Sequence, residues 1–158
     1  MKEIPLTRGQ VAIVDNADYT YLSQFKWFAW KDRKNGMYYA MRSPSILMHR
    51  VIMGLTDPKI QVDHKNGNGL DNQRENLRTA TGRQNQYNQG IHRNNTSGFK
   101  GVYWQKSARK WRAFIKVRGK QVHLGLFDDP QKAAQAYDIA AIHHAGEYAK
   151  LNFERGEI

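Results

Sequence analysis

The chain has 158 residues, no cysteine and a formal net charge of +11. The lack of cysteine excludes a disulfide framework and thiolate metal sites, and no apolar run approaches the ~20 residues that a membrane helix needs. The first residues lack the apolar core of a signal peptide, so we expect a soluble cytoplasmic protein without a membrane partner. The length suits one ordinary domain or two small ones.

A small β-rich lead-in is predicted for residues 1–45. Segment 10–14 is mostly apolar and predicts a buried strand, whereas Tyr19, Leu22 and Phe25 recur at helical spacing and predict a short helix over 18–25. The next predicted elements are two aromatic-rich strands, at 27–30 and 38–42, around an Asn-Gly turn, and a helix over 46–55 that ends at a glycine.

The stretch 61–88 carries the main functional signal. It opens with Val62-Asp63-His64, continues through the loop KNGNGLDN and reaches Asn76-Leu77-Arg78. Asn-Gly pairs accept positive φ at little cost, so the loop predicts a connection between two strands. A Thr-Ala-Thr run then supplies an N-cap for a helical segment over 82–87. We expect Asp63 and His64 at the end of the first strand and Asn85 on the helix facing them.

These side chains suit metal-assisted phosphodiester cleavage. Asp63 offers a carboxylate oxygen and Asn85 an amide oxygen, which are hard ligands of the kind that Mg²⁺ or Mn²⁺ takes. His64 has an imidazole that titrates near neutral pH and can take a proton from the attacking water. Asn76 has both donors and an acceptor with which to tie the loop to His64.

The spacing of Asp63, His64, Asn76 and Asn85 resembles the motif of the HNH endonucleases, the ββα-metal fold, over residues 48–88. The resemblance is to the variant with two asparagines. It implies that His64 is the general base, that Asn76 is the structural asparagine of the catalytic motif, and that Asn85 is a metal ligand. The asparagine at the last position favours oxygen coordination over zinc. We therefore predict an HNH nuclease domain at residues 1–88.

The basic charge is concentrated downstream of the motif. No acidic residue lies between Glu75 and Asp128, and the eleven basic residues of this interval account for the whole net charge, because the rest of the chain carries 14 basic and 14 acidic residues. Such a block repels itself unless a polyanion such as nucleic acid neutralises it.

Residues 89–97 lack hydrophobic periodicity and predict a linker. Arg93, followed by two asparagines, fits an extended arm in a minor groove of DNA. A plain flexible spacer is an equal alternative.

Three antiparallel strands and one helix are predicted for residues 98–158. The strands are expected at 99–104, 110–117 and 121–127, and the helix runs from a cap at Asp128 or Asp129 to Gly146. In the middle strand Arg112 and Lys116 share one face, while apolar residues occupy the other. Small residues let the helix pack on the apolar face, so the basic face stays open to the major groove of duplex DNA.

The phrases FKGVYW, KWRAFIKV, HLGLFDDPQKAAQAYDIAA and AKLNF resemble the plant apetala/ethylene-response-factor DNA-binding domain. In that family the sheet lies on the major groove. Carried over by position, the DNA contacts fall on Lys100, Tyr103, Gln105, Arg112, Lys116 and His123. Several arginines and tryptophans of the family are replaced here, for example by Tyr103 and His123, so the family's target sequence does not transfer.

Together these features predict an α+β protein with a β-rich lead-in, a ββα-metal module, a linker and a three-stranded antiparallel sheet packed on one helix. The expected function is site-selective, metal-dependent cleavage of double-stranded DNA, with a monomer nicking one strand. The resemblance implies a homing or phage endonuclease that acts in a bacterial host. Two alternatives are a DNA-binding regulator without cleavage and a sequence-tolerant nuclease.

Overall fold

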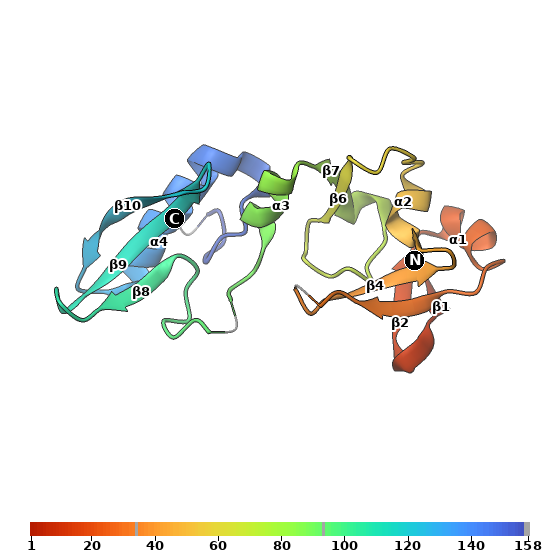
Figure 1. Ribbon diagram of the computed structural model, residues 1–158, viewed down its shortest axis with the longest axis horizontal. Coiled ribbons are helices and arrows are strands. Elements are labelled where there is room, and N and C mark those ends of the chain that lie inside the picture. Colours follow the sequence, from red (N-terminus) through yellow and green to blue (C-terminus); the bar gives the residue numbers. More distant parts are fainter. Residues whose placement is uncertain (34, 93, 157–158) are drawn as a thin grey trace. The chain divides into compact units, whose positions relative to one another are not determined.

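The computed structural model describes residues 1–33, 35–92 and 94–156, which form two compact units, Met1–Thr81 and Gly82–Ile158 (Figure 1). Arg93, the predicted minor-groove residue, lies outside the described residues. Within those ranges no helix is both long and apolar enough to cross a membrane.

The first unit begins with the expected β-rich lead-in. Its elements are β1 (Lys2–Pro5), the 3-10 turn η1 (Thr7–Gly9), β2 (Val11–Val14), α1 (Asn16–Leu22), β3 (Phe28–Lys31), β4 (Tyr38–Arg42), β5 (Ile46–Leu47) and α2 (Met48–Ile52). β1 and β2 form an antiparallel hairpin, and β3, β4 and β5 form a second sheet in that order. The helix predicted over 46–55 is shorter, because its first two residues pair with β4 and Gly54 takes a positive φ of 64°.

The core of this unit joins the lead-in to the predicted nuclease motif. Apolar side chains from both parts are buried together: Ile4, Ala12, Val14, Leu22, Trp27, Ala40, Met48, Ile52, Leu70 and Leu77. The last two of these belong to the loop and the second strand of the motif, so the motif cannot be separated from the lead-in without exposing apolar surface.

The motif itself is a two-stranded antiparallel sheet with a long loop. β6 (Gln61–His64) pairs with β7 (Leu77–Ala80), and the 3-10 turn η2 (Arg74–Asn76) precedes β7. β2 anchors the loop: the amide of Ile13 donates to the carbonyl of Leu70 at 2.9 Å, and the amide of Asn72 donates to the carbonyl of Ile13 at 2.8 Å. The lead-in strand therefore fixes the loop that surrounds His64.

Gly69 allows this loop to approach β4 closely. A Cβ atom at position 69 would lie 2.5 Å from the carbonyl oxygen of Tyr38 and 2.7 Å from the ring of Tyr39. Both distances are too short for real contacts, so only glycine fits at this point of the loop.

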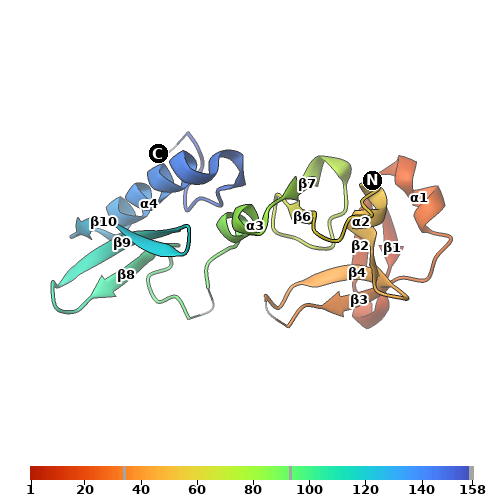
Figure 2. The same ribbon diagram turned by 45° about the horizontal axis from the view of Figure 1, so that its top comes forward.

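The second unit contains the predicted sheet and helix (Figure 2). Its elements are α3 (Gly82–Asn88), β8 (Val102–Gln105), β9 (Lys110–Val117), β10 (Lys120–Phe127), α4 (Pro130–Ala145) and the 3-10 turn η3 (Gly146–Tyr148). The strands are antiparallel in the order β10-β9-β8. Asp129 caps α4 by accepting the amide of Gln131 at 2.8 Å, and the small residues of α4 pack on Val102, Ala113 and Ile115.

α3 packs within the second unit. Tyr87 is buried against Ile115, Tyr137 and Ala141, and its hydroxyl donates to the carbonyl of Lys116 at 3.1 Å. A helix of seven residues cannot stabilise itself in water, and here the buried tyrosine supplies its packing. The compact units consequently divide after Thr81 rather than after Asn88.

The end of the predicted linker is also ordered by hydrogen bonds. The hydroxyl of Ser97 donates to the carbonyl of Val102 at 2.8 Å, and the side-chain amide of Asn95 donates to the carbonyl of Phe99 at 2.8 Å. These side chains tie residues 95–97 to the beginning of the sheet, so this part of 89–97 belongs to the second unit.

Candidate functional site

His64 lies at the end of β6 in a buried aromatic environment. Its exposed fraction is 4%. The ring centroid is 5.2 Å from that of His49 and 5.9 Å from that of Tyr39. Burial lowers the pKa of His64, while the neighbouring Asn72 and Asp63 act in the opposite direction. The lowered pKa favours the neutral imidazole at pH 7, in which one ring nitrogen has a proton and the other a lone pair.

Asn72 determines which nitrogen of His64 has the lone pair. Its side chain is fully buried, and Nε2 of His64 lies 3.5 Å from its Oδ1. The Nδ2 group of Asn72 donates to the carbonyl of Leu70 at 3.1 Å, which fixes the orientation of the amide. Because Oδ1 only accepts hydrogen bonds, this contact favours the tautomer with the proton on Nε2, in which Nδ1 is the basic atom. Asn72 was not among the predicted site residues, although it stands in the loop of the motif.

Asp63 is directly opposite Arg78 in the β6–β7 register and is paired with it. Nη2 of Arg78 lies 2.7 Å, and Nε 2.8 Å, from Oδ2 of Asp63. Both side chains are nearly buried, with exposed fractions of 8% and 10%. The guanidinium thus supplies a counter-charge for a carboxylate that would otherwise be costly to bury. Arg78 was not among the predicted site residues, although the antiparallel register suggested by the motif places it beside Asp63.

Asn76 holds the loop at two points. Its Oδ1 accepts the amide of Asn66 at 3.0 Å, and its Nδ2 donates to the carbonyl of Asp71 at 2.7 Å. The backbone carbonyl of Asn76 accepts the amide of Lys65 at 2.9 Å. These contacts hold the backbone of the loop that follows His64, so Asn76 has a structural role.

His49 and Arg50 are neighbours on α2 with different surroundings. His49 is 6% exposed, and burial, together with His64, lowers its pKa to about 3. Its Nδ1 has no hydrogen-bond partner in the described part of the chain. Arg50 holds the next loop, because its guanidinium donates to the carbonyls of Asp57 and Ile60, each at 2.6 Å.

The open face of the second unit is formed by residues that stand opposite one another in the sheet. The pairs are Tyr103–Arg112, Gln105–Lys110, Phe114–His123 and Lys116–Gln121. Directly opposed residues share a face. Five of the predicted DNA contacts, Tyr103, Gln105, Arg112, Lys116 and His123, therefore occupy the face opposite the buried Ala113 and Ile115. The guanidinium of Arg112 lies 5.7 Å from the centre of the Tyr103 ring.

Comparison with known proteins agrees with both parts of this description. A family model described as HNH endonuclease matches residues 47–87, and a model of the AP2 domain matches residues 97–146. Protein 3.8 of Escherichia phage T7 is 40% identical over 90 residues, which are 57% of this chain and 74% of that protein. The chain belongs to the HNH endonuclease family and carries an AP2 domain.

Two further relatives show how the parts are distributed. The uncharacterized HNH endonuclease L560 of Acanthamoeba polyphaga mimivirus is 29% identical over 150 residues, which are 92% of this chain and 76% of that protein. The AP2-like ethylene-responsive transcription factor TOE2 of Arabidopsis thaliana is 40% identical over 65 residues, 41% of this chain but only 13% of the plant protein. The likeness to the plant protein is thus limited to a small part of its length.

HNH nucleases generally depend on a divalent metal. Asp63 offers a carboxylate and Asn85, on α3, an amide oxygen, which are hard donors. Among the described residues no three histidine, cysteine, aspartate or glutamate side chains cluster as a metal cage. Asp63 belongs to the first unit and Asn85 to the second, and each carries an oxygen of the kind that Mg²⁺ and Mn²⁺ take.

Lys100 does not stand with the other predicted DNA contacts. Its ammonium donates to the carbonyl of Tyr87 at 2.5 Å and lies 5.8 Å from the centre of the Tyr137 ring. Burial lowers its pKa to about 8. The side chain is directed toward α3 and α4 of this HNH protein, away from the open face of the sheet.

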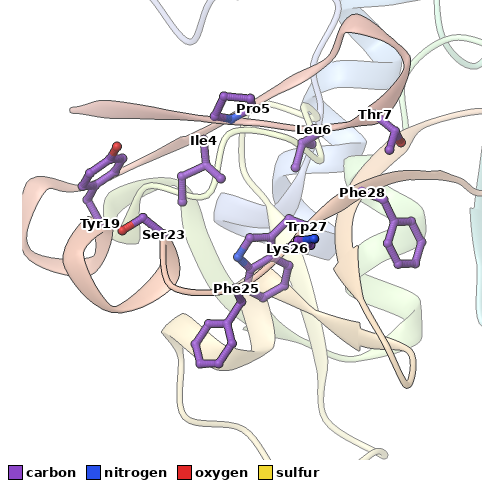
Figure 3. A pocket seen from close by; sticks show the side chains of 10 residues that line it. All are labelled: Ile4, Pro5, Leu6, Thr7, Tyr19, Ser23, Phe25, Lys26, Trp27 and Phe28. Atoms are coloured by element: carbon purple, nitrogen blue, oxygen red, sulfur yellow. The ribbon is translucent and has the colours of Figure 1, made fainter.

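A groove of about 650 Å³ on the lead-in lies outside the motif (Figure 3). Its lining is mainly apolar and aromatic, with Ile4 and Leu6 on one side and Phe25 and Trp27 on the other. The lining contains neither a histidine nor a carboxylate.

Proposed function

We propose that this protein is a site-selective, metal-dependent DNA endonuclease of the homing or free-standing phage type. The observation that carries the proposal is the setting of His64, a buried neutral imidazole whose Nε2 faces the amide oxygen of Asn72 at 3.5 Å. Such an imidazole presents Nδ1 as a general base at neutral pH. The phage and mimivirus relatives support an origin in a mobile element.

His64 takes a proton from the water that attacks the phosphodiester, and Asn72 holds its ring in the required tautomer. Asp63 and Asn85 are the proposed ligands of Mg²⁺ or Mn²⁺, which when bound polarises the phosphate and stabilises the leaving oxygen. Asn76 keeps the loop around His64 in place through Asn66 and Asp71.

The open face of the AP2 domain is the proposed DNA-reading surface. Arg112 and Lys116 are suited to phosphates and base edges in a major groove, and Tyr103, Gln105 and His123 stand beside them. Arg93 is a proposed additional contact in the minor groove. A monomer has one general base and therefore cuts one strand at a time, so it nicks duplex DNA once for each binding event. The reaction takes place in the cytoplasm of an infected bacterial cell.

Two other functions make different predictions for the same variants. A sequence-tolerant nuclease loses affinity uniformly when Arg112 or Lys116 is replaced by alanine, whereas a site-selective enzyme also loses its preference among sequences. A DNA-binding regulator binds but never cuts. The buried Asp63–Arg78 pair and the oriented His64 favour the nuclease, because a regulator has no use for an oriented base.

Incubation with supercoiled plasmids that carry fragments of phage and bacterial genomes tests the proposal. With Mg²⁺ or Mn²⁺ we expect open-circular product at a reproducible position, and with EDTA none. Scattered nicks would favour the sequence-tolerant nuclease. DNA that is bound but intact across all fragments and both metals would favour the regulator.

A further inference from the structure

Trp30 is an exposed aromatic residue close to the candidate base. Its exposed fraction is 39%, and it lies in β3 directly opposite Tyr39 of β4, with which it shares one face of the sheet. The ring centroids of Trp30 and Tyr39 are 6.0 Å apart, and Tyr39 lies 5.9 Å from His64. Two adjacent ring contacts therefore connect a solvent-exposed indole to the buried imidazole.

A cleft with basic walls adjoins Trp30. It has a volume of about 620 Å³, and its lining includes Arg8, Trp30, Lys31 and Arg33. Asp32 also lines it, so the lining has three basic residues and one acidic residue. Lys31 stands on the other face of β3 from Trp30, with its ammonium 5.5 Å from the centre of the Tyr38 ring. The backbone amide of Asp32 donates to the carbonyl of Met37 at 2.8 Å, which closes the turn between β3 and β4. Positive charge beside an exposed aromatic is the pattern of surfaces that bind nucleic-acid strands.

We propose that this cleft is a subsite for the cleaved DNA strand, in which the indole of Trp30 stacks on a nucleobase near the scissile phosphate. The inference rests on the proposed nuclease function. Arg8 and Arg33, which line the same cleft, neutralise the phosphates on either side of that nucleotide. This assigns a substrate contact to the lead-in, which neither the HNH motif at 47–87 nor the AP2 domain at 97–146 includes.

The ring distances between Trp30, Tyr39 and His64 limit how far the stacked nucleotide lies from the cleaved bond. The two ring contacts place Trp30 no more than ~12 Å from His64, and successive phosphates of a DNA strand are about 3.4 Å apart along the helix axis. The stacked nucleotide is thus within about four positions of the cleaved bond. A base can stack on a protein side chain only after it leaves its neighbours in the duplex. The subsite therefore favours DNA that is unpaired or easily distorted beside the cleavage position.

Three variants, compared with the wild type, separate this role from a general effect of surface aromatics. Trp30→Ala removes the stacking ring, and Trp30→Tyr retains one. Tyr21→Ala removes another exposed aromatic of the same unit, which is 52% exposed on α1 and does not line the cleft. Binding of labelled single-stranded and duplex DNA is measured with EDTA, and single-turnover cleavage with Mg²⁺, on duplexes with and without one unpaired nucleotide near the nick. Thermal unfolding confirms that each variant is folded.

Loss of one base–aromatic stack weakens binding by roughly five- to a hundredfold. We expect this loss for Trp30→Ala, a change of less than about threefold for Trp30→Tyr, and wild-type behaviour for Tyr21→Ala. We expect the wild type to cut the duplex with an unpaired nucleotide faster than the fully paired duplex, and this difference in cleavage rate should disappear in Trp30→Ala. Replacing Arg8 and Arg33 by glutamine should make the plot of log binding constant against log salt concentration less steep, by about 0.9 in slope for each lost phosphate contact.

Two results would overturn the inference in different ways. If the wild type cuts DNA but Trp30→Ala binds and cuts like Tyr21→Ala, the subsite does not exist and the nuclease function stands. If the wild type neither binds nor cuts any DNA offered, the proposed function fails and the subsite fails with it.

Discussion

Nε2 of His64 lies 3.5 Å from Oδ1 of Asn72, and both side chains are buried. The amide of Asn72 cannot turn over without losing the hydrogen bond from its Nδ2 to the carbonyl of Leu70. A buried polar group that loses its partner costs free energy, so the loop holds the amide in one orientation. The histidine that is proposed to cut DNA is thereby held in one tautomer by a residue outside the four matched positions of the motif.

Replacing Asn72 by leucine should release this control. We expect the His64 ring to populate both neutral tautomers and single-turnover cleavage to fall about tenfold, which is part of the ~10²–10⁴ that a general base contributes. Asn72→Asp retains an acceptor for Nε2–H and should keep the tautomer. Long-range ¹H–¹⁵N NMR of the imidazole measures the protonated nitrogen directly. A wild-type ring protonated on Nδ1 would contradict the assignment.

His49 should make the stability of the first unit sensitive to acid. Burial lowers its pKa to about 3 in the folded state, whereas an unfolded chain has a histidine pKa near 6.5. Between those values the unfolded state binds more protons, so the free energy of unfolding falls as the pH decreases, by at most about 1.4 kcal/mol for each pH unit.

Urea unfolding at pH 7, 6, 5 and 4 measures this loss. His49→Phe keeps a ring beside His64 and Tyr39 but cannot be protonated, so its unfolding free energy should fall less steeply over the same range. His64 contributes in the same direction, because its pKa is also lowered, and some acid sensitivity should remain. Parallel curves for the wild type and His49→Phe would show that His49 is not the group responsible.

Two lysines of the second unit should respond in opposite ways to replacement by alanine. Lys100→Ala removes a half-buried side chain that donates to the carbonyl of Tyr87, and we expect a loss of about 1–3 kcal/mol in unfolding free energy with DNA affinity almost unchanged. Lys116→Ala acts on the open face, so stability should change by less than about 0.5 kcal/mol while DNA affinity and its salt dependence decrease. Thermal unfolding and fluorescence anisotropy at several salt concentrations measure both effects. A loss of DNA affinity in Lys100→Ala would instead show that Lys100 contributes to DNA binding.

The features that the sequence predicted well are those with a local cause. The strands of the aromatic lead-in and of the AP2 domain follow from side-chain alternation, which requires only neighbouring residues to be known. The face shared by Arg112 and Lys116 follows from the same period. Asp63 and His64 fall at the end of a strand as the motif predicted, because the Asn-Gly loop marks that end.

The features that the sequence missed depend on contacts between distant segments. Asn72 becomes a partner of His64 only because its loop pairs with Ile13, far away in the sequence. α3 joins the second unit because Tyr87 finds a site among Ile115 and Tyr137, and no local pattern specifies that choice. Lys100 matches a DNA-contact position, but its long stem allows the ammonium to turn inward.

The role of His64 as general base is tested by comparing His64→Ala with the wild type on one DNA molecule that the wild type nicks. Cleavage is measured with Mg²⁺ and binding with EDTA, and His143→Ala, which removes an exposed histidine of α4, serves as control. We expect His64→Ala to cut ~10²–10⁴-fold more slowly and to bind DNA with an affinity within about twofold of the wild type. His143→Ala should behave as the wild type. Cleavage by His64→Ala at the wild-type rate, or a loss of binding parallel to the loss of cleavage, would contradict the assignment of His64 as the general base.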